Sequence, residues 1–486
     1  MKIIINHNSK IPTYMQIAGQ IKQEILTGEL ATTGVLPSER ALAQMLGVHR
    51  NTISKAYAEL KSEGAISSKQ GVGYIVAERR KAEQDDHPKK VSWKAEIADR
   101  YLDMEVTFDD IFQRFASKDK ISMGSGLPSP GMYDEKDVAD RLARMICDEG
   151  KTQYFYSPYK GDTTLRKALV PFLGTKGIKA TTGQIQILSE TNQAIDFLVT
   201  LLVRPGDTVV MEEPVSPDAY RAMELAGARI ATVPVDEEGM DTDALEVLLE
   251  RIHPRFIFVN SSFHDPTSTI LSIERRQKIV ELSNMYRIPV IEEDAASELV
   301  YDGIKVPPIK SFDTLGNVIY VYSFSLTFVP GLSLAFVVAD RELIESLSYL
   351  VSVRMMSIDW TTQKLLAEYL EDGSYYRFLD SFRESYGRKQ ELVCDALDRL
   401  ATYGVSYVKP RGGVYIWCKL PEGVDSKEFV EKAYKAGVSF VPGSVFYPFK
   451  NGGRDHIRIN FTYESEERIT EGIAILEREI VELLSN

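Results

Sequence analysis

The sequence predicts two folded parts: a winged helix-turn-helix (α+β) domain at the N-terminus and a much larger α/β domain that carries a smaller α+β part. Three observations lead to this fold class. Three amphipathic helical patterns and a glycine-containing hairpin fill the first 77 residues. Short apolar runs alternate with helical stretches from about Ile121 onward. Strand-like runs return near the C-terminus, and a chain of 486 residues is long enough for two or three domains.

The first two helices have recognisable ends. Ile17, Ile21 and Ile25 repeat every four residues along one face, and Gly28 is placed to stop that helix. The second helix begins after Ser38, whose hydroxyl can accept a hydrogen bond from a free amide of the first turn. Its expected buried side consists of Ala41, Leu42 and Met45, and Gly47 is expected to cap its C-terminal end.

A third helix and a hairpin complete the N-terminal part. The helix carries apolar side chains at the i, i+3, i+4 and i+7 positions of an amphipathic face, namely Ile53, Ala56, Tyr57 and Leu60. Two short strands, 65–68 and 74–76, flank a glycine-containing tip at 69–73. A helix, a turn, a second helix and a hairpin in this order indicate a winged helix-turn-helix domain at 1–77.

Residues 36–43 and 46–53 closely resemble the signature of the GntR family of transcriptional regulators. The resemblance extends over roughly residues 10–77, and it implies a partner, double-stranded operator DNA, whose major groove receives the third helix. His49 departs from the family, which usually has a serine that caps this helix; histidine caps less well and could contact DNA instead. The alternative is a small helical domain that binds protein.

The candidate DNA contacts cluster around the third helix and the wing. Arg50 can reach a guanine or a phosphate, Thr52 can bind a phosphate, and Lys69 can reach the backbone or the minor groove. The full set of expected DNA-binding residues is Ser38, Arg40, His49, Arg50, Asn51, Thr52, Lys55, Lys69 and Gly71.

Charge is distributed unevenly along the chain. Residues 1–90 contain 13 Lys and Arg and 9 Asp and Glu, a net charge of +4, so the rest carries −17 of the total of −13. A basic N-terminal part attached to an acidic body indicates that only the first part meets a polyanion. A linker is expected at 78–118, because residues 78–90 are almost entirely polar.

Several classes of protein are excluded. No apolar run approaches a membrane span, and the N-terminus lacks the apolar segment of a signal peptide, so we expect a cytoplasmic protein without membrane contact. Cys147, Cys394 and Cys418 are widely separated, which favours free thiols over a disulfide framework. The cysteines and the six histidines show no metal-ligand spacing, so no metal is expected.

The large C-terminal region has the pattern of a mainly parallel sheet. Its short buried-strand runs have helical stretches between most of them, which is typical of α/β folds. The expected strands are 186–188, 208–211, 229–233, 256–259, 289–292 and 318–321, and, in the smaller part, 412–417 and 456–461. We expect a large subdomain at 119–345 and a small one at 346–486.

The order of motifs across 120–486 resembles the class I/II aminotransferases, which have the fold-type I architecture. The segments that carry the resemblance include Tyr159 to Arg166, Arg204 to Asp207 and Glu212 to Pro214. Together with a GntR domain, this is the organisation of the MocR-type regulators. The resemblance implies a homodimer with domain exchange, because such folds build their site at a subunit interface and the DNA-binding part of one chain docks on the other chain.

The loop from Ser323 to Leu332 resembles the loop that carries the cofactor lysine of pyridoxal-phosphate (PLP) enzymes, but Leu326 stands at the lysine position. That lysine forms the Schiff base to the cofactor and moves protons during transamination. Leucine can do neither. The resemblance therefore predicts an aminotransferase-like domain that is not an enzyme.

Other positions of the cofactor site also differ from the family. Glu190 stands where a glycine opens the phosphate-binding helix, and a carboxylate about 4 Å from a phosphate charge costs roughly 4 kcal/mol at an effective dielectric near 20. Ser216 replaces the aromatic residue that stacks on the cofactor ring, and Ala295 replaces a tyrosine. Ser333 replaces the phosphate-binding arginine, and Ser268 stands at a usual glycine.

Two family positions are retained. Asp294 stands where the family pairs the pyridine nitrogen, and Arg458 stands where it binds a substrate carboxylate. The alternative for Asp294 is a strand-end carboxylate that caps a turn. The alternative for Arg458 is an arginine in a structural ion pair. The expected effector pocket consists of Glu190, Thr191, Asn192, Ser216, Asp265, Asp294, Ser323, Ser325, Leu326, Ser333 and Arg458.

These observations predict a DNA-binding transcriptional regulator whose aminotransferase-like domain is catalytically inactive, senses an effector and dimerises. We expect no cofactor, with PLP bound only non-covalently if at all, and an effector that is an amino acid or a carboxylate. Two alternatives stay open. One is a PLP-binding regulator or a PLP-dependent aminotransferase, and the other is an inactive domain that serves only dimerisation.

Overall fold

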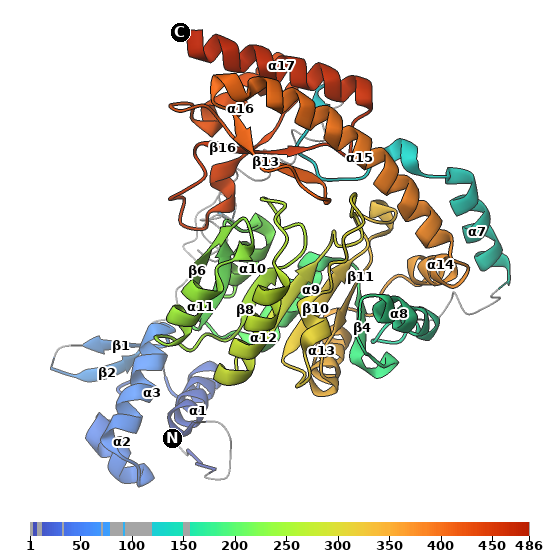
Figure 1. Ribbon diagram of the computed structural model, residues 1–486. Helices are drawn as coiled ribbons and strands as arrows, with labels where there is room; N and C mark the ends of the chain where they lie inside the picture. Colours follow the sequence, from blue (N-terminus) through green and yellow to red (C-terminus); the bar gives the residue numbers. More distant parts are fainter. Residues whose placement is uncertain are drawn as a thin grey trace. The chain divides into compact units, whose positions relative to one another are not determined.

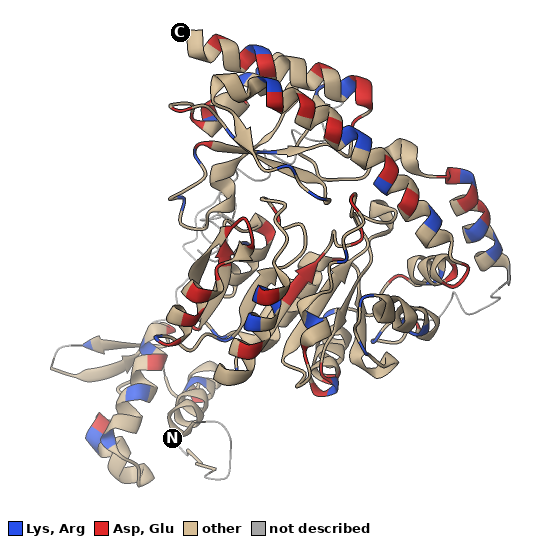
Figure 2. Cartoon of the chain, viewed as in Figure 1, with Lys and Arg blue, Asp and Glu red and all other residues tan. Residues whose placement is uncertain are grey.

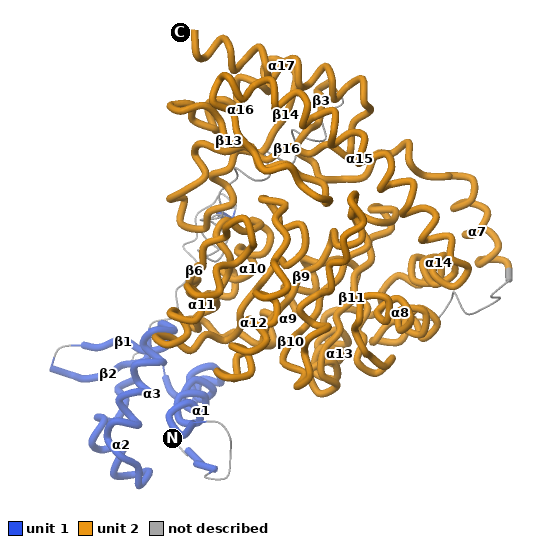
Figure 3. Tube along the Cα trace, viewed as in Figure 1, with its two compact units in different colours: residues 1–96 blue, residues 97–486 orange. Residues whose placement is uncertain are grey.

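The computed structural model describes residues 3–6, 12–31, 34–69, 71–77, 91–92, 119–148 and 156–485. The chain divides into two compact units, residues 1–96 and residues 97–486 (Figure 3). The expected linker at 78–118 lies almost wholly outside the described residues. Each unit is described below on its own.

Unit 1 contains the three helices and the hairpin that the sequence predicts (Figure 1). The hairpin strands are antiparallel, and Ile66 pairs with Val76. Ile17, Ile21 and Tyr57 are fully buried in a core that the helices share. The elements are α1 (Thr13–Thr27), α2 (Glu39–Leu46), α3 (Arg50–Ser62), β1 (Ile66–Lys69) and β2 (Gly73–Val76).

The helix ends of unit 1 follow their local signals. The Ser38 hydroxyl accepts a hydrogen bond from the amide of Ala41 at 3.2 Å, as expected for an N-cap. Gly28 and Gly47 end α1 and α2 with φ of 84° and 65°, a conformation that favours glycine. The expected buried side of α2 is partly wrong, because Ala41 is exposed and Met45 is 64% exposed. Leu42 and Ala43 are the buried residues instead.

Unit 2 is built on an eight-stranded sheet with the order β4-β11-β10-β9-β8-β5-β6-β7 (Figure 1). Strands β10, β9, β8, β5 and β6 are parallel to one another, whereas β4, β11 and β7 pair in antiparallel fashion with their neighbours. The strands are β4 (Ile185–Leu188), β5 (Thr208–Glu213), β6 (Arg229–Asp236), β7 (Gly239–Met240), β8 (Ile257–Asn260), β9 (Val290–Asp294), β10 (Val318–Ser323) and β11 (Ala335–Val338).

Helices cover both faces of this sheet, so unit 2 has a core on each side. Val209 and Met211 of β5 pack under α9, α10 and α13, whereas Val210 packs under α11 and α12 on the opposite face. This division follows from the alternation of side chains along a strand. The helices are α8 (Thr163–Thr175), α9 (Thr191–Leu202), α10 (Pro217–Leu225), α11 (Thr242–Leu249), α12 (Ile273–Tyr286) and α13 (Arg341–Arg354).

The C-terminal part contains an antiparallel sheet with the order β12-β13-β16-β15, which packs against three helices. The strand expected at 412–417 begins later, at Tyr415. The elements are α14 (Trp360–Glu371), α15 (Ser374–Leu400), β12 (Ser406–Tyr407), β13 (Tyr415–Lys419), α16 (Ser426–Ala436), β14 (Val438–Ser439), β15 (Val441–Pro442), β16 (His456–Asn460) and α17 (Glu466–Ser485).

The first described segment of unit 2 joins the C-terminal part rather than the large sheet. Strand β3 (Ile121–Ser122) lies parallel to β14, and Ile121 pairs with Val438. The amide of Ser122 donates to the carboxylate of Glu464 at 2.7 Å. The large subdomain expected at 119–345 therefore begins with residues that pack elsewhere. Helix α7 (Glu135–Asp148) follows and contacts α14.

In the described part of the chain, no helix is both long and apolar enough to cross a membrane.

Candidate functional site

The residues expected to contact DNA lie on the surface of unit 1. They occupy the N-terminal ends of α2 and α3 and the turn between β1 and β2 (Figure 1). Thr52 is half-buried, and the exposed members of the set are Ser38, Arg40, His49, Arg50, Asn51, Lys55, Lys69 and Gly71. The residue next to Lys69 at the tip, Gln70, lies outside the described residues.

Two interactions fix the start of α3. The Nδ1 atom of His49 accepts a hydrogen bond from the amide of Asn51 at 3.3 Å, so His49 caps the helix in the way a serine would. The Nε atom of Arg50 donates to the carboxylate of Glu39 on α2 at 3.1 Å. Exposed ion pairs of this kind contribute little free energy, so a DNA phosphate can compete for Arg50.

Unit 2 contains a cavity of about 230 Å³ at the carboxyl ends of its parallel strands, the edge where open α/β sheets bind ligands. It lies between the starts of α9 and α10, the loops that follow β8, β9 and β10, and the start of β13. Eight of the expected pocket residues line it: Glu190, Thr191, Asn192, Ser216, Asp265, Ser323, Ser325 and Leu326.

Asp294, Ser333 and Arg458 do not line this cavity. The hydroxyl of Ser333 donates to the carbonyl of Pro330 at 3.3 Å within its own turn. The structure brings in other residues that sequence reasoning missed. They are Asp218, Asn260, Ser262, Phe263, Glu293, Ala295, Ala296, Val414 and Tyr415. Of these, only Ala295 was discussed from the sequence, as the position of a lost tyrosine.

The strand β9 ends in three acidic residues, visible as the red strand end in Figure 2, and only the middle one reaches the cavity. Neighbouring side chains on a strand point to opposite faces, so Glu293 faces the cavity whereas Glu292 and Asp294 do not. The alternation of side chains along β9 was the signal in the sequence that could have identified Glu293.

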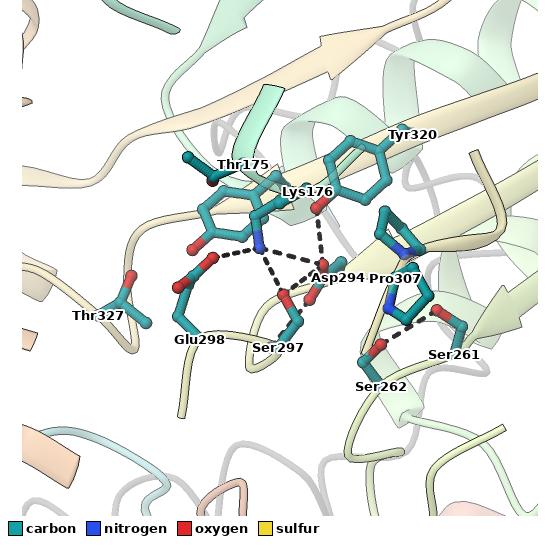
Figure 4. Close-up of polar contacts among 12 residues, drawn as sticks. Thr175, Lys176, Ser261, Ser262, Asp294, Ser297, Glu298, Pro307, Tyr320 and Thr327 are labelled. Carbon is teal, nitrogen blue, oxygen red and sulfur yellow. Dashed lines mark hydrogen bonds and ion pairs between the residues drawn. The ribbon is translucent and has the colours of Figure 1, made fainter. Parts of the chain in front are cut away.

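Asp294 is fully buried and engaged by protein groups (Figure 4). Its carboxylate accepts hydrogen bonds from the Tyr320 hydroxyl at 2.6 Å, the Ser297 hydroxyl at 2.6 Å and the Ser297 amide at 3.0 Å. The Lys176 ammonium lies 3.9 Å away and pairs with Glu298 at 2.5 Å. Asp294 thus caps the turn after β9, the alternative considered for it.

Arg458 also has partners within the protein. Its Nη1 atom donates to Asp265 at 2.6 Å and its Nη2 atom to the carbonyl of Gly124 at 3.1 Å. Its guanidinium lies 3.9 Å from the centre of the Tyr415 ring. This arrangement matches the alternative of a structural ion pair.

The cavity has an acidic lining. Glu190, Asp218, Asp265 and Glu293 contribute carboxyl groups, and no Lys, Arg or His belongs to the lining that the structure describes. Burial raises the pKa of Glu293 to about 7, and Asp265 and Asp218 add to the rise. Burial also raises the pKa of Asp218 and the neighbouring Asp265 adds to the rise, whereas Asn192, Arg221 and Arg458 lower it. The carboxyl groups therefore face one another closely enough to repel.

This lining suits the phosphate of PLP poorly. A dianion needs donors or cations, and the start of α9 presents the Glu190 carboxylate, which makes no capping hydrogen bond to its own helix. No described lysine lines the cavity to replace Leu326. Lys176 pairs with Glu298, and the Lys310 ammonium donates to Asp313 at 2.8 Å.

Comparisons with known proteins agree with the two-part organisation. Residues 13–76 match the family of bacterial regulatory proteins, gntR family, and residues 118–476 match aminotransferase class I and II. The HTH-type transcriptional regulator YdfD of Bacillus subtilis (strain 168) is 28% identical over 481 residues, which cover 98% of each chain. The probable rhizopine catabolism regulatory protein MocR of Rhizobium meliloti is 25% identical over 90% of this chain and 88% of that one.

A solved structure resembles unit 2. It is LysN, the α-aminoadipate aminotransferase of Thermus thermophilus, complexed with N-(5'-phosphopyridoxyl)-L-leucine. The similarity has a TM-score of 0.75 at 29% identity and covers 81% of this chain and all of that one.

Proposed function

Because this chain belongs to the aminotransferase class I and II family and, through its GntR-type domain, to the MocR-type subfamily of GntR transcriptional regulators, we propose that an inactive aminotransferase-like domain controls its binding to DNA. The observation that carries this proposal is Leu326, which lines the cavity where such an enzyme needs a lysine. The domain then binds a small molecule without converting it. Because its proposed partner is DNA, we expect the protein to act in the cytoplasm.

Unit 1 supplies the DNA contacts in this proposal. The third helix of a helix-turn-helix domain enters the major groove with its N-terminal residues toward the bases. That end of α3 presents exposed Arg50 and Asn51, and the wing presents exposed Lys69. Arg50 reads a guanine or holds a phosphate, whereas Lys69 contacts the backbone.

The cavity favours effector sensing over a domain that serves only dimerisation. Phe328 is buried in the core and leaves the cavity free, and Leu326 forms one wall of it. A space of about 230 Å³ lined by carboxyl, amide and hydroxyl groups offers the polar contacts that orient a small ligand. Binding there shifts the DNA affinity only if the ligand prefers one of two arrangements of the protein.

We extend the proposal to a homodimer with domain exchange, as the subfamily's organisation implies. Two copies of unit 1 would then contact two half-sites whose spacing follows the two-fold symmetry of the dimer. Sedimentation of the full chain, alone and with a two-half-site DNA, measures the number of protomers in each species.

The direct test is retardation of DNA from the region upstream of the protein's own gene. We expect the purified full chain to retard this DNA at moderate salt, and a shuffled sequence of the same length to be retarded only at higher protein concentration. Equal retardation of both sequences, or of neither, contradicts the proposal.

A titration with PLP tests whether the domain is inactive. We expect no visible absorbance band of a lysine-bound cofactor and no rise in melting temperature. A band means that another lysine substitutes for Leu326 and that the domain is not inactive. A rise in melting temperature without a band favours the alternative, a regulator that senses PLP non-covalently.

A further inference from the structure

The cavity of unit 2 concentrates negative charge. Its described lining holds four carboxyl groups and no cationic side chain, and the neighbouring Arg458 is turned toward Asp265. No three His, Cys, Asp or Glu side chains in the described residues are arranged to hold a metal ion. The charge in the cavity therefore calls for a ligand of positive charge that is not a metal.

The carboxyl groups are held in place by amides. The Nδ2 atom of Asn260 donates to Glu293 at 3.1 Å, and the side chain of Asn192 donates to Asp218. Each amide supports a carboxylate without neutralising it. Two carboxyl groups on different elements, β9 and α10, are thus presented to the same space, and a bound cation would favour the ionised form of Glu293, whose pKa burial raises to about 7.

Aromatic side chains give the same cavity a second feature that suits organic cations. Phe263 and Tyr415 both line it. The Tyr415 ring already accepts one cation, because the Arg458 guanidinium lies 3.9 Å from its centre. Aromatic faces attract ammonium and guanidinium groups, and they cover the alkyl part of such a ligand as well.

We propose that the effector is a small organic cation with one or two ammonium or guanidinium groups and without a carboxylate or phosphate. Its cationic groups pair with Glu293 and Asp218, and its carbon chain lies against Leu326 and the aromatic walls. This inference rests on the proposed function, in which the cavity binds an effector. It replaces the expected amino acid or carboxylate.

A ligand carboxylate fits this cavity poorly for two reasons. It meets four carboxyl groups, and the arginine that would bind it must first leave Asp265. Breaking a buried pair leaves the Asp265 charge without a partner, which is costly in a site of low dielectric. A phosphate carries more charge and meets the same obstacles.

Matched pairs of small molecules test the proposal by calorimetric titration of the full chain. The first pair is 1,4-diaminobutane and 4-aminobutyrate, in which a carboxylate replaces one aminomethyl group. The second pair is 2-phenylethylamine and phenylalanine, which differ by a carboxylate. We expect saturable binding of at least one amine, at least tenfold tighter than its carboxylate partner, and no binding of PLP at the same concentrations.

Variants locate the binding in the cavity. Glu293→Gln and Asp218→Asn keep the shape of each side chain and remove its charge, and we expect each to weaken amine binding at least tenfold. Glu345→Gln makes the same chemical change on α13 outside the cavity and should leave affinity unchanged. Circular dichroism of each variant confirms that it is folded before its affinity is compared.

Several outcomes overturn the inference. They are no binding of either amine, equal or tighter binding of the carboxylates or of PLP, and amine binding that both cavity variants leave unchanged. DNA retardation by the same preparation separates the two proposals. DNA binding without amine binding overturns the proposal of a cationic effector and leaves the proposed regulatory function standing. Amine binding without DNA binding overturns the proposed regulatory function and leaves the cation-binding cavity standing.

Discussion

Arg458 donates to Asp265 at 2.6 Å and packs over Tyr415, so this arginine, which the sequence predicts to stand where aminotransferases bind a substrate carboxylate, is bound to a carboxylate of its own chain. The two partners come from β16 and from the loop after β8. This pair leaves a ligand carboxylate without its counterion. It also suggests how the charge preference of the cavity could be changed by one substitution.

Asp265→Asn is expected to shift the preference of the cavity toward carboxylates. The substitution removes one negative charge from the lining and releases the Arg458 guanidinium from its ion pair. We expect the ratio of affinities for 4-aminobutyrate and 1,4-diaminobutane to rise at least tenfold, measured by calorimetry. Asp380→Asn, on the exposed face of α15, is the matched control and should not move the ratio. An unchanged ratio in a folded Asp265→Asn protein would contradict the role assigned to the pair.

Leu326→Lys is expected to block the cavity rather than to restore a cofactor site. The new ammonium would lie among the four carboxyl groups and compete with any bound cation. We expect amine binding to fall at least tenfold and the absorbance band of a lysine-bound cofactor to stay absent when PLP is added. Leu326→Met, which has a similar volume and no charge, should retain amine affinity. A band in the lysine variant would show that the remaining residues still accept PLP.

Arg50→Ala is expected to weaken DNA binding and to reduce its dependence on salt. If Arg50 contacts a phosphate, the slope of the logarithm of affinity against the logarithm of salt concentration falls by about one. If it reads a guanine, affinity for the operator falls by about 1–3 kcal/mol and discrimination falls with it. Lys61→Ala, near the other end of α3, is the matched control. Retardation assays over a range of salt measure both quantities, and identical behaviour of the two variants would exclude Arg50 from the interface.

Glu212→Gln tests a buried carboxyl group whose ionisation opposes folding. Burial raises the pKa of Glu212 from 4.5 to about 8, and burial lowers the pKa of His264 to about 3, although the two side chains lie 3.7 Å apart. The folded state therefore keeps the Glu212 proton at pH values where the unfolded chain has released it. The free energy of unfolding then falls as pH rises from about 4.5 to about 8, by about 1.4 kcal/mol per pH unit.

The new side chain of Glu212→Gln cannot ionise, so the free energy of unfolding of this variant should not show this decrease as pH rises. As pH rises from 6 to 8, the difference in free energy of unfolding between the variant and the parent should shift in favour of the variant by about 2.5 kcal/mol. Chemical denaturation at both pH values measures the difference, and Glu345→Gln on the surface should show none. A parallel response of parent and Glu212→Gln would mean that Glu212 is ionised in the folded protein.

The sequence was most informative where a signal is local. Ser38, Gly28 and Gly47 mark helix ends because each residue satisfies or permits a backbone conformation at its own position. Met45 shows the limit of this reasoning, since apolar spacing on a short helix does not decide which of its faces meets α3. Alternation predicted six of the eight strands of the large sheet in unit 2, but it missed the short strands β7 and β11 and could not give the position of each strand in the sheet.

The cavity was harder to predict, because its chemistry depends on which side of a strand each residue faces. Asp294 and Glu293 are neighbours, and a shift of one position exchanges a turn cap for a cavity carboxylate. Asp218 and Tyr415 are nearly 200 positions apart in the chain, and only the folded structure brings them together. The net charge of the cavity could be read only after this assembly, so the sequence alone favoured a carboxylate effector.

Strand β3 fixes the first described segment of unit 2 to the C-terminal part of that unit. The first described segment of unit 2 is tied to β14 by its backbone, and the Arg468 guanidinium of α17 donates to the carbonyl of Lys120 at 2.8 Å. Among the described residues, the first segment of unit 2 is therefore held by the C-terminal part and not by the eight-stranded sheet, so loss of the pairing between β3 and β14 would free this segment without opening that sheet.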